Sequence, residues 1–442
     1  MSRIQHRNQE IQAVLTLSGE SALEQAAQAD QEFAAREGTP GPRSLLGIPV
    51  LIKDMIETAG IRTTAGSKFF DNYLPVEDAE VVRRLKASGV VVLGKTQTHE
   101  LALGVMGVNP FFGTVRNPRD LSRISGGSSS GSAAAVASGM CLAALGTDTG
   151  GSIRIPASLC GVVGLKPTYG RVSTRGVIPL SWNLDTVGPL TRSVQDAALL
   201  LQVLAGYDPH DPGSAKVPVA DYGVSLEDGW PGLHIAVGVG KYMETSAPVV
   251  LEAVQRAALL VEREGARLGQ VNMDWMAELA RANTAMTQAD AAAFHHERLV
   301  SHPDWFGPDV RQRLEQGAAL SSSDYALARW KQQEGRRRFE ELFTEFDLLL
   351  LPTTPIQAPL IEDAGALQAA QQLTRFTAPM NLAGLPAISM PCGSRDQLPI
   401  ELQLVSAPWQ EAVLLRSAAA WERIWNDGAA SSKQGGAGYF RG

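Results

Sequence analysis

Three short segments of the chain combine residue types that could perform nucleophilic chemistry without histidine. Residues 47–54 place Lys53 at the end of an apolar run, residues 126–132 form a serine–glycine loop, and residues 146–157 form a glycine loop that contains Ser152. A serine nucleophile needs a base to remove its proton. A buried lysine can be that base, because desolvation lowers its pKa from about 10.4 towards neutrality.

The two glycines before Ser152 favour stabilisation of a negatively charged oxygen. Gly150 and Gly151 carry no side chains, so their backbone N–H groups can be approached closely. Adjacent N–H groups of this kind form the oxyanion hole that acyl transfer requires. The second loop therefore combines a candidate nucleophile with candidate donors for its transition state.

Residues 89–96 fit a different motif, the G-x4-G-K-T pattern of a phosphate-binding loop. Such a loop must lie between a strand and a helix, with its N–H groups turned towards phosphate. Here the four central residues are Val-Val-Val-Leu, which favour the strand itself. A nucleotide-binding protein that uses Gly89–Thr96 is the alternative outside hydrolase chemistry.

Residues 127–131 also fit G-x-S-x-G, the nucleophile elbow of α/β-hydrolases. That elbow follows an apolar strand, whereas the preceding residues 119–125 are poor strand formers. A triad would also need a later aspartate and histidine, and no later histidine has a distinguishing setting. The elbow is therefore a weaker interpretation than a lysine-dependent serine.

The elements that must position these residues alternate between strand and helix. Residues 48–52 and 90–93 are short apolar runs typical of buried strands, and residues 80–88 repeat apolar side chains at helical spacing. Strand, helix and strand with short links predict a parallel sheet covered by helices. Residues 132–140 predict a helix of small residues that packs closely.

Composition and charge predict a globular cytoplasmic protein. The chain has 442 residues, 44% of them hydrophobic, which is enough for a large core. Its net charge of −7 argues against binding to nucleic acid or to anionic membranes. Three cysteines cannot form a disulfide framework, and residues 1–12 lack the apolar run of a signal peptide. We expect no direct contact with nucleic acid and none with a membrane.

Together, the three segments resemble the amidase signature family of Ser–cis-Ser–Lys hydrolases. The resemblance rests on G-x-P-x-x-x-K-D at residues 47–54, on GGSS at residues 126–129 and on G-T-D-x-G-G-S-x-R at residues 146–154. It extends over about residues 40–420. It implies an α/β fold: a single large domain with a mixed, mostly parallel twisted sheet covered by helices on both faces. Further matching segments are residues 160–173, 184–190 and 381–393.

The resemblance also implies a mechanism. Lys53 would accept the proton of Ser128, which follows a cis peptide at Gly127, and Ser128 would accept the proton of the nucleophile Ser152. The reaction would hydrolyse a carboxamide to a carboxylate plus ammonia or an amine. No metal or organic cofactor is implied. The expected oxyanion hole comprises Thr149, Gly150, Gly151 and Ser152, and the expected supporting network comprises Asp148, Arg154 and Asp185.

The substrate pocket of the family is lined by variable segments, which here carry mainly apolar side chains. That mix predicts an apolar or aromatic acyl group more than a charged one. The candidate pocket residues are Met106, Phe111, Met286, Phe294, His295 and Phe376.

The domain organisation is predicted to be simple. Residues 1–426 form one domain, with a catalytic core at residues 40–205 and a part at residues 230–426 that completes the sheet and the substrate pocket. Residues 427–442 are rich in glycine and serine and predict a flexible tail. We expect a small-molecule amide as the partner, and a monomer or a homodimer.

The alternative within the family is the A subunit of a glutamine-dependent tRNA amidotransferase. That protein must hold both charged ends of glutamine and requires partner subunits. An acidic residue expected before the segment 376–379 is Thr374 in this chain, which disfavours that alternative.

Overall fold

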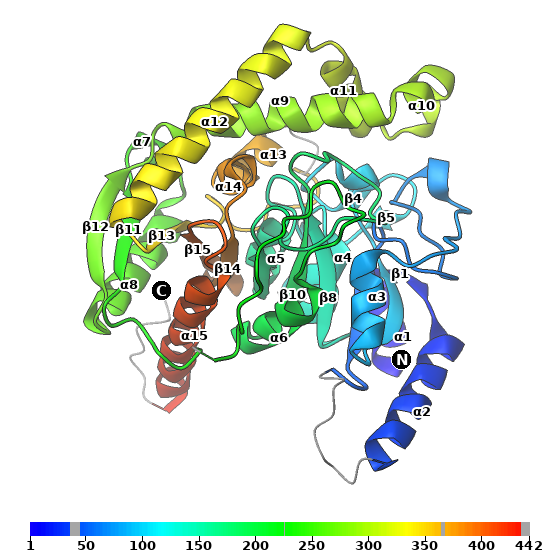
Figure 1. Ribbon diagram of the computed structural model, residues 1–442, viewed down its shortest axis with the longest axis horizontal. Helices are drawn as coiled ribbons and strands as arrows, with labels where there is room; N and C mark the ends of the chain where they lie inside the picture. The colour runs from blue at the N-terminus through cyan, green and yellow to red at the C-terminus, as the bar shows by residue number, and fades with distance from the viewer. Residues whose placement is uncertain (36–44, 225, 364–366, 435–442) are drawn as a thin grey trace.

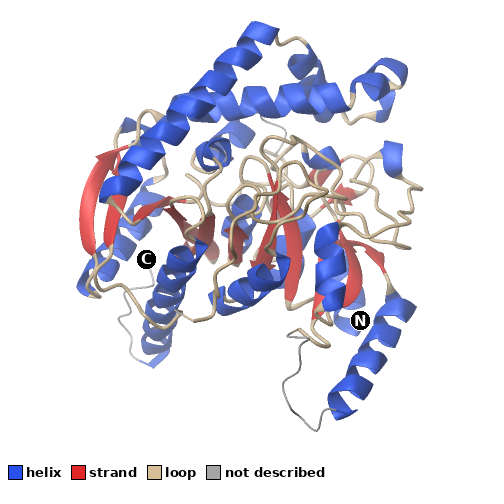
Figure 2. Cartoon of the chain, viewed as in Figure 1, coloured by secondary structure: helices blue, strands red, loops and turns tan. Residues whose placement is uncertain are grey.

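One mixed sheet of eleven strands runs through the molecule (Figures 1 and 2). The structure, a computed structural model, describes residues 1–35, 45–224, 226–363 and 367–434. The strands lie in the order β1-β3-β2-β8-β10-β9-β14-β15-β13-β11-β12. Their bounds are β1 Val14–Leu17, β2 Pro49–Lys53, β3 Val91–Thr96, β8 Ala143–Asp148, β9 Val163–Lys166, β10 Thr186–Thr191, β11 His234–Val239, β12 Arg267–Asn272, β13 Leu348–Pro352, β14 Ala387–Arg395 and β15 Leu398–Ser406.

Helices cover both faces of this sheet (Figure 1). Their bounds are α1 Ser2–Ile11, α2 Gly19–Ala35, α3 Glu80–Ala87, α4 Ser130–Ala137, α5 Arg154–Cys160, α6 Val194–Leu204, α7 Lys241–Glu244, α8 Pro248–Arg263, α9 Met276–Phe294, α10 His296–Ser301, α11 Pro308–Ala318, α12 Ser322–Glu345, α13 Leu367–Leu373, α14 Ala378–Ala383 and α15 Glu411–Gln434. Four short strands form two small ribbons: β4 Val108–Asn109 with β5 Gly113–Thr114, and β6 Arg116–Asn117 with β7 Asp120–Ile124. The 3-10 turns are Lys68–Phe70, Glu100–Ala102 and Pro303–Trp305.

The sheet is parallel within β3-β2-β8 and within β13-β11-β12, and it is antiparallel between these two groups and at the edge strand β1. Strand β2 pairs in parallel with β3 and β8, and β11 pairs in parallel with β12 and β13. The predicted mixed sheet covered by helices is confirmed, and its antiparallel part is larger than expected. One reason is the hairpin of β14 and β15, which turns at Asp396 and Gln397 with φ of 52° and 65°. Antiparallel strands can be joined by such a two-residue turn, but Asp-Gln is a weak sequence signal for it.

Alternate residues of the buried strands face opposite helical layers, as the two-residue period of a strand requires. In β13, Leu348 and Leu350 pack into the core formed with α3, α6, α8 and α15. Leu349 and Leu351 pack into the core formed with α9, α12 and α14. Because both faces are buried, these strands are continuously apolar instead of alternating.

Small side chains bring α4 close to the strands that end at the candidate site. All seven residues from Ser130 to Val136 are buried. A Cβ atom on Gly131 would lie 2.2 Å from the Ala13 carbonyl oxygen and 2.6 Å from the Gln97 nitrogen. The predicted close-packed helix is therefore confirmed, although it begins two residues earlier than expected.

The phosphate-binding interpretation of residues 89–96 is wrong. Residues Val91–Thr96 form strand β3, which pairs with β1 and β2 inside the sheet. The Lys95 side chain is fully buried, donates to the Ile56 carbonyl at 2.5 Å and the Thr63 hydroxyl at 2.7 Å, and lies 3.7 Å from Asp54. The segment forms no phosphate-binding loop, because its backbone pairs with neighbouring strands and its lysine lies beside the buried carboxylate of Asp54.

Helices form both described ends of the chain, and the C-terminal one differs from its prediction. The polar start forms helix α1, and β1 then pairs with β3 at the edge of the sheet. At the other end α15 continues to Gln434, so residues 427–434 are helical where a tail was expected. Residues 435–442 and the predicted core boundary at residue 40 lie outside the described residues.

The hydrolase-elbow interpretation of residues 127–131 also fails. The strand before it, β7, belongs to a small ribbon separate from the main sheet. An elbow nucleophile must follow a strand of the central sheet. Separately, no helix within the described ranges has both the length and the apolar character needed to span a membrane.

Candidate active site

The ends of two parallel strands bring the lysine to the second glycine loop. Strand β2 ends at Lys53 and its parallel neighbour β8 ends at Asp148, so both ends lie at the same edge of the sheet. The Lys53 side chain is fully buried. Its Nζ atom lies 2.7 Å from the hydroxyl of Ser128 and 2.7 Å from that of Thr147. The strand thus delivers an amine directly to a serine hydroxyl.

Burial changes the acid–base character of this amine. Desolvation lowers the pKa of Lys53 to about 7, even though the nearby carboxylates of Asp185 and Asp148 act in the opposite direction. A large fraction of the amine is therefore neutral near pH 7, and only the neutral form can accept a proton.

The Gly127–Ser128 peptide is cis, as predicted. The Ser128 carbonyl accepts hydrogen bonds from the Thr98 hydroxyl at 2.9 Å and from the His99 N–H at 3.3 Å. These contacts fix the backbone of the serine whose hydroxyl meets Lys53. Among the described residues, no hydrogen bond joins the hydroxyls of Ser128 and Ser152, so that half of the predicted arrangement remains a prediction.

The glycine loop that contains Ser152 is held by a buried carboxylate. Asp148 accepts hydrogen bonds from the N–H of Gly151 at 2.7 Å and from that of Ile153 at 3.1 Å. Arg154 forms a two-pronged ion pair with the same carboxylate, at 3.1 Å and 3.0 Å. Burial alone would raise the pKa of Asp148, but the Arg154 guanidinium and further donors hold it well below its usual range. Asp148 therefore stays ionised and orders the loop.

This arrangement corrects the predicted oxyanion hole at one position. The Gly151 N–H is already used by Asp148, and Gly151 itself has a φ of +129°. A Cβ atom there would lie 2.2 Å from the Thr377 hydroxyl. Among the described residues, the N–H groups of Thr149, Gly150 and Ser152 have no acceptor. They remain the candidate donors, whereas Gly151 contributes conformation and close packing.

Asp185 supports the same loop from the next strand. It accepts a hydrogen bond from the Thr149 hydroxyl at 2.5 Å and from the N–H groups of Leu180 and Ser181 at 2.9 Å and 3.1 Å. Burial raises the pKa of Asp185 to about 6, despite these donors. Like Asp148 and Arg154, it acts on the loop and does not line the pocket beside Ser152.

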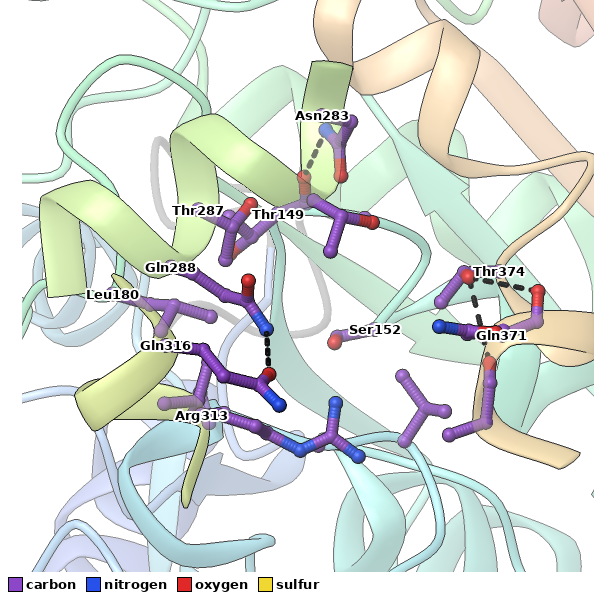
Figure 3. Close-up of a pocket in the computed structure, with 17 residues that line it drawn as sticks. Thr149, Ser152, Leu180, Asn283, Thr287, Gln288, Arg313, Gln316, Gln371 and Thr374 are labelled. Carbon is purple, nitrogen blue, oxygen red and sulfur yellow. Dashed lines mark hydrogen bonds between the residues drawn. The ribbon is translucent and has the colours of Figure 1, made fainter. Parts of the chain in front are cut away.

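A pocket of about 270 Å³ opens in front of Ser152 (Figure 3). Helix α9 contributes Asn283 and Gln288, and α11 contributes Gln316. The opposite side comes from Gln371 and other residues of the α13 segment. Most of the labelled wall side chains are polar amides and hydroxyls, whereas Leu103, Val105 and Leu180 add an apolar side, so the pocket combines hydrogen-bonding groups with apolar surface.

Arg313 is the only charged residue among the described residues that line this pocket. Its side chain is half-buried, and its Nε atom is buried without a hydrogen-bond partner. Within the described ranges, no ion pair or hydrogen bond holds the guanidinium. Burial lowers the pKa of Arg313, and Asp309 one turn earlier acts in the opposite direction. A half-buried guanidinium without a direct partner can gain from an anion that joins it in the pocket.

The six predicted pocket residues do not line this pocket. Met286 and Phe376 belong to the core beneath α9 and α14, and Met106 belongs to a small core around α5. His295 is buried against Phe294. Their apolar character reflects core packing, so the predicted preference for an apolar acyl group loses its basis. The centre of the Phe111 ring lies 4.9 Å from the ammonium nitrogen of Lys68.

Several residues of the site were not identified by the sequence analysis. Thr147, the second partner of Lys53, stands inside the glycine motif and could have been noticed there. Asn283 donates to the Thr149 carbonyl at 3.1 Å, yet it lies in an ordinary helix. Arg313 follows Arg311 in the same helix, and only the fold distinguishes the pocket arginine from its exposed neighbour.

The sheet, the cis peptide and the serine-bonded lysine are those of an amidase signature enzyme, which acts on carbon–nitrogen bonds. The chain belongs to the amidase family, whose model matches residues 1–415. It is 41% identical over 447 residues to the A subunit of the glutamyl-tRNA(Gln) amidotransferase from Moorella thermoacetica, covering 96% of this chain and 91% of that protein.

Two solved structures extend the comparison. One is a vestigial protein complex that reveals the evolutionary origins of an s-triazine catabolic enzyme; the TM-score is 0.90 at 35% identity, over 96% of this chain and 93% of the other. The second is the native peptide amidase of Stenotrophomonas maltophilia, with a TM-score of 0.82 at 31% identity, over 96% and 91%. The same fold thus occurs in a protein within a complex and in a peptide amidase.

The expectation of a monomer or homodimer without nucleic acid is wrong. The Moorella relative is one subunit of an amidotransferase named for glutamyl-tRNA(Gln), and the s-triazine neighbour was found in a protein complex. The inference rested on the net charge of one chain, and that quantity does not report on partner subunits.

Proposed function

We propose that this chain hydrolyses the carboxamide of a small anionic amide, with Ser152 as nucleophile and Lys53–Ser128 as the proton relay. Neutral Lys53 takes the Ser128 proton, and Ser128 takes the proton of Ser152 as its oxygen attacks the amide carbon. The 2.7 Å contact between Lys53 and Ser128 and the lowered pKa of the lysine support this order.

The tetrahedral intermediate carries a negative oxygen, which N–H groups of Thr149, Gly150 and Ser152 would stabilise. The relay then returns its proton to the amide nitrogen, so the nitrogen leaves as ammonia or an amine. Water attacks the acyl-enzyme with the same relay as base and releases the carboxylate. Apart from the attacking water, the groups named in these steps are side chains and backbone groups of this chain.

The proposal of an anionic substrate rests on Arg313, which has no hydrogen-bond or ion-pair partner among the described residues. A guanidinium offers planar paired donors that match a carboxylate. With an anion bound, the half-buried guanidinium of Arg313 would gain a direct partner, whereas without one it has no described hydrogen bond or ion pair.

Glutamine hydrolysis within an amidotransferase is the best-supported form of this activity. The matched relatives from Moorella and Koribacter, at 41% and 42% identity, are A subunits of glutamyl-tRNA(Gln) amidotransferases. We infer that this chain works in the same way: it would release ammonia from glutamine while partner subunits hold the tRNA. The α-carboxylate of glutamine would pair with Arg313.

A second candidate is an anionic amide without an ammonium group. No carboxylate is present among the described residues that line the pocket, and Thr374 stands where an acidic residue was expected. A glutamine ammonium would therefore lack an ionic partner from this chain. The similarity to the complex of an s-triazine catabolic enzyme supports a role in a complex that acts on another nitrogen-rich amide.

Ammonia release distinguishes the two candidates. The chain would be assayed, alone and with the partner subunits of a related amidotransferase, on glutamine, on its deaminated analogue glutaramate and on the neutral amide butyramide. Preference for glutamine supports the amidotransferase form, and preference for glutaramate supports the second candidate. Equal or better turnover of butyramide would contradict an anionic substrate.

A further inference from the structure

A second cavity lies directly outside the active-site pocket. It has a volume of about 550 Å³ and shares Thr284, Gln371 and Thr374 with the pocket in front of Ser152. These three residues therefore form the boundary between the two spaces. Figure 3 shows Gln371 and Thr374 facing the Ser152 side of the pocket. We call this outer cavity the vestibule; its other lining residues are Tyr242, Ala277, Ala280, Arg281, Gln372 and Arg375.

The charge of the vestibule is opposite to that of the whole chain. Arg281 and Arg375 line it, and no acidic residue does so among the described residues. With Arg313 in the inner pocket, three arginines line the two cavities of a chain whose net charge is −7. The carboxylate of Glu278, one turn before Arg281, is held by Lys331 at 2.8 Å, so it is already offset.

Arg375 is held in position by its neighbours. Its guanidinium donates to the Thr245 hydroxyl at 2.6 Å and lies 4.5 Å from the centre of the Tyr242 ring. The Tyr242 hydroxyl in turn donates to the Arg375 carbonyl at 2.9 Å. Because no carboxylate takes part in these contacts, the positive charge remains available to a ligand in the vestibule.

We propose that the vestibule is an anion-attracting entrance, in which Arg281 and Arg375 concentrate anionic amides before they reach Arg313 and Ser152. A concave site lined by one sign of charge raises the local concentration of oppositely charged ligands. The two arginines do not touch the reacting atoms, so they act on the approach of the substrate and not on the chemical step. This inference deepens the proposed function, on whose anionic substrate it rests.

The test uses a reaction that depends on Ser152 but on no particular substrate. The probes are 4-(fluorosulfonyl)benzoate, which is anionic, and its neutral methyl ester. In both, the Ser152 oxygen replaces fluoride on sulfur and the relay takes the hydroxyl proton. The second-order labelling rate of each probe is measured for wild type and for the double variant Arg281→Gln/Arg375→Gln.

We expect the double variant to react about 3- to 10-fold more slowly with the anionic probe at about 20 mM ionic strength. The difference should vanish near 500 mM, where the Debye length is only about 4 Å. The neutral ester should react equally with both proteins. Arg375→Lys keeps the charge and should retain most of the labelling rate with the anionic probe. Arg3→Gln removes an arginine on the distant helix α1, and its labelling rate should match that of the wild type.

Three results would overturn the proposal: wild-type labelling in the double variant, an equal loss with both probes, or a loss that persists at high salt. The last two would identify a structural or direct-contact role. Turnover of anionic amides is measured in a separate assay of ammonia release. If the vestibule effect is present but no anionic amide is turned over by the wild type, the entrance stands and the proposed substrate class is wrong.

Discussion

The floor of the site (Lys53, Ser128 and residues 149–152) comes from strand ends and loops in the first half of the chain, whereas its wall comes from α9, α11 and α13, far later in the sequence. The floor is mostly buried, and hydrogen bonds hold it internally and to the carboxylates of Asp148 and Asp185. The wall is more open, and its one cation has no described partner. A floor fixed by internal hydrogen bonds, with free N–H groups only beside the nucleophile, suits one fixed reaction, and a wall with an unpartnered cation suits the binding of a ligand.

This contrast predicts two kinds of mutant. Changes in the floor should slow every substrate, because each substrate needs the same proton transfers. Changes in the wall should alter the preference between charged and neutral substrates, with little effect on the intrinsic reactivity of Ser152.

Ser152→Ala should have the largest effect. Amide turnover should fall roughly 10⁴-fold or more, because no other group can form the acyl-enzyme. The melting temperature should stay within a few degrees, since the hydroxyl faces the pocket. Mass spectrometry after fluorophosphonate treatment measures labelling, and wild-type labelling of the variant would show that the nucleophile is another residue.

Lys53→Met should lower amide turnover by about 10²–10⁴-fold, and ester turnover less, because an ester leaving group needs little protonation. In the wild type, kcat/KM should fall as the pH decreases through about 7, where the buried amine becomes protonated and stops acting as a base. This acid limb should be absent from the variant. Profiles from pH 5 to 10 on a matched amide and ester measure both effects.

The matched control is Lys95→Met. Lys95 is equally buried, and burial lowers its pKa to about 8, but it faces Asp54 instead of a serine. Its loss leaves a buried carboxylate uncompensated, so stability should drop by about 3 kcal/mol while the activity per folded molecule remains. Equal kinetic losses in the two variants would mean that Lys53 is merely structural.

Arg313→Gln should weaken the binding of anionic substrates without changing the reactivity of Ser152. The KM for an anionic amide should rise about 10- to 100-fold, because a charge-assisted hydrogen bond is lost, whereas butyramide turnover should hardly change. Arg311→Gln is the control: it lies two residues away and pairs with Glu315 at 2.7 Å. An equal rise for neutral and anionic amides would contradict an anion site at Arg313.

Thr374→Asp should produce the smallest change, a severalfold shift in kcat/KM from glutaramate towards glutamine. The new carboxylate would face the pocket and could pair with the ammonium group of glutamine. Ratios of kcat/KM for the two substrates measure the shift. A loss of both activities in parallel would show that Thr374 serves the packing of the α13 segment instead.

The floor could be predicted from residue types and their immediate neighbours. A lysine that ends an apolar strand, a Gly-Gly-Ser-Ser loop and a Gly-Gly-Ser loop are local features, and their chemistry follows from the side chains that they contain. The buried strands were predictable for the same reason, because continuous apolar runs such as Leu348–Leu351 record burial on both faces.

The wall could not be predicted, because it depends on how distant helices pack. Arg311 and Arg313 have nearly the same local sequence, yet one faces solvent and the other the pocket, because helix rotation and packing of α11 against α9 set their directions. The same holds for Met286 and Phe376, whose apolar side chains fill the core instead of the pocket. It also holds for the Gly151 N–H, which a carboxylate three residues earlier had already taken. A local pattern specifies which groups a chain can offer, and packing between distant segments decides which of them meet the ligand.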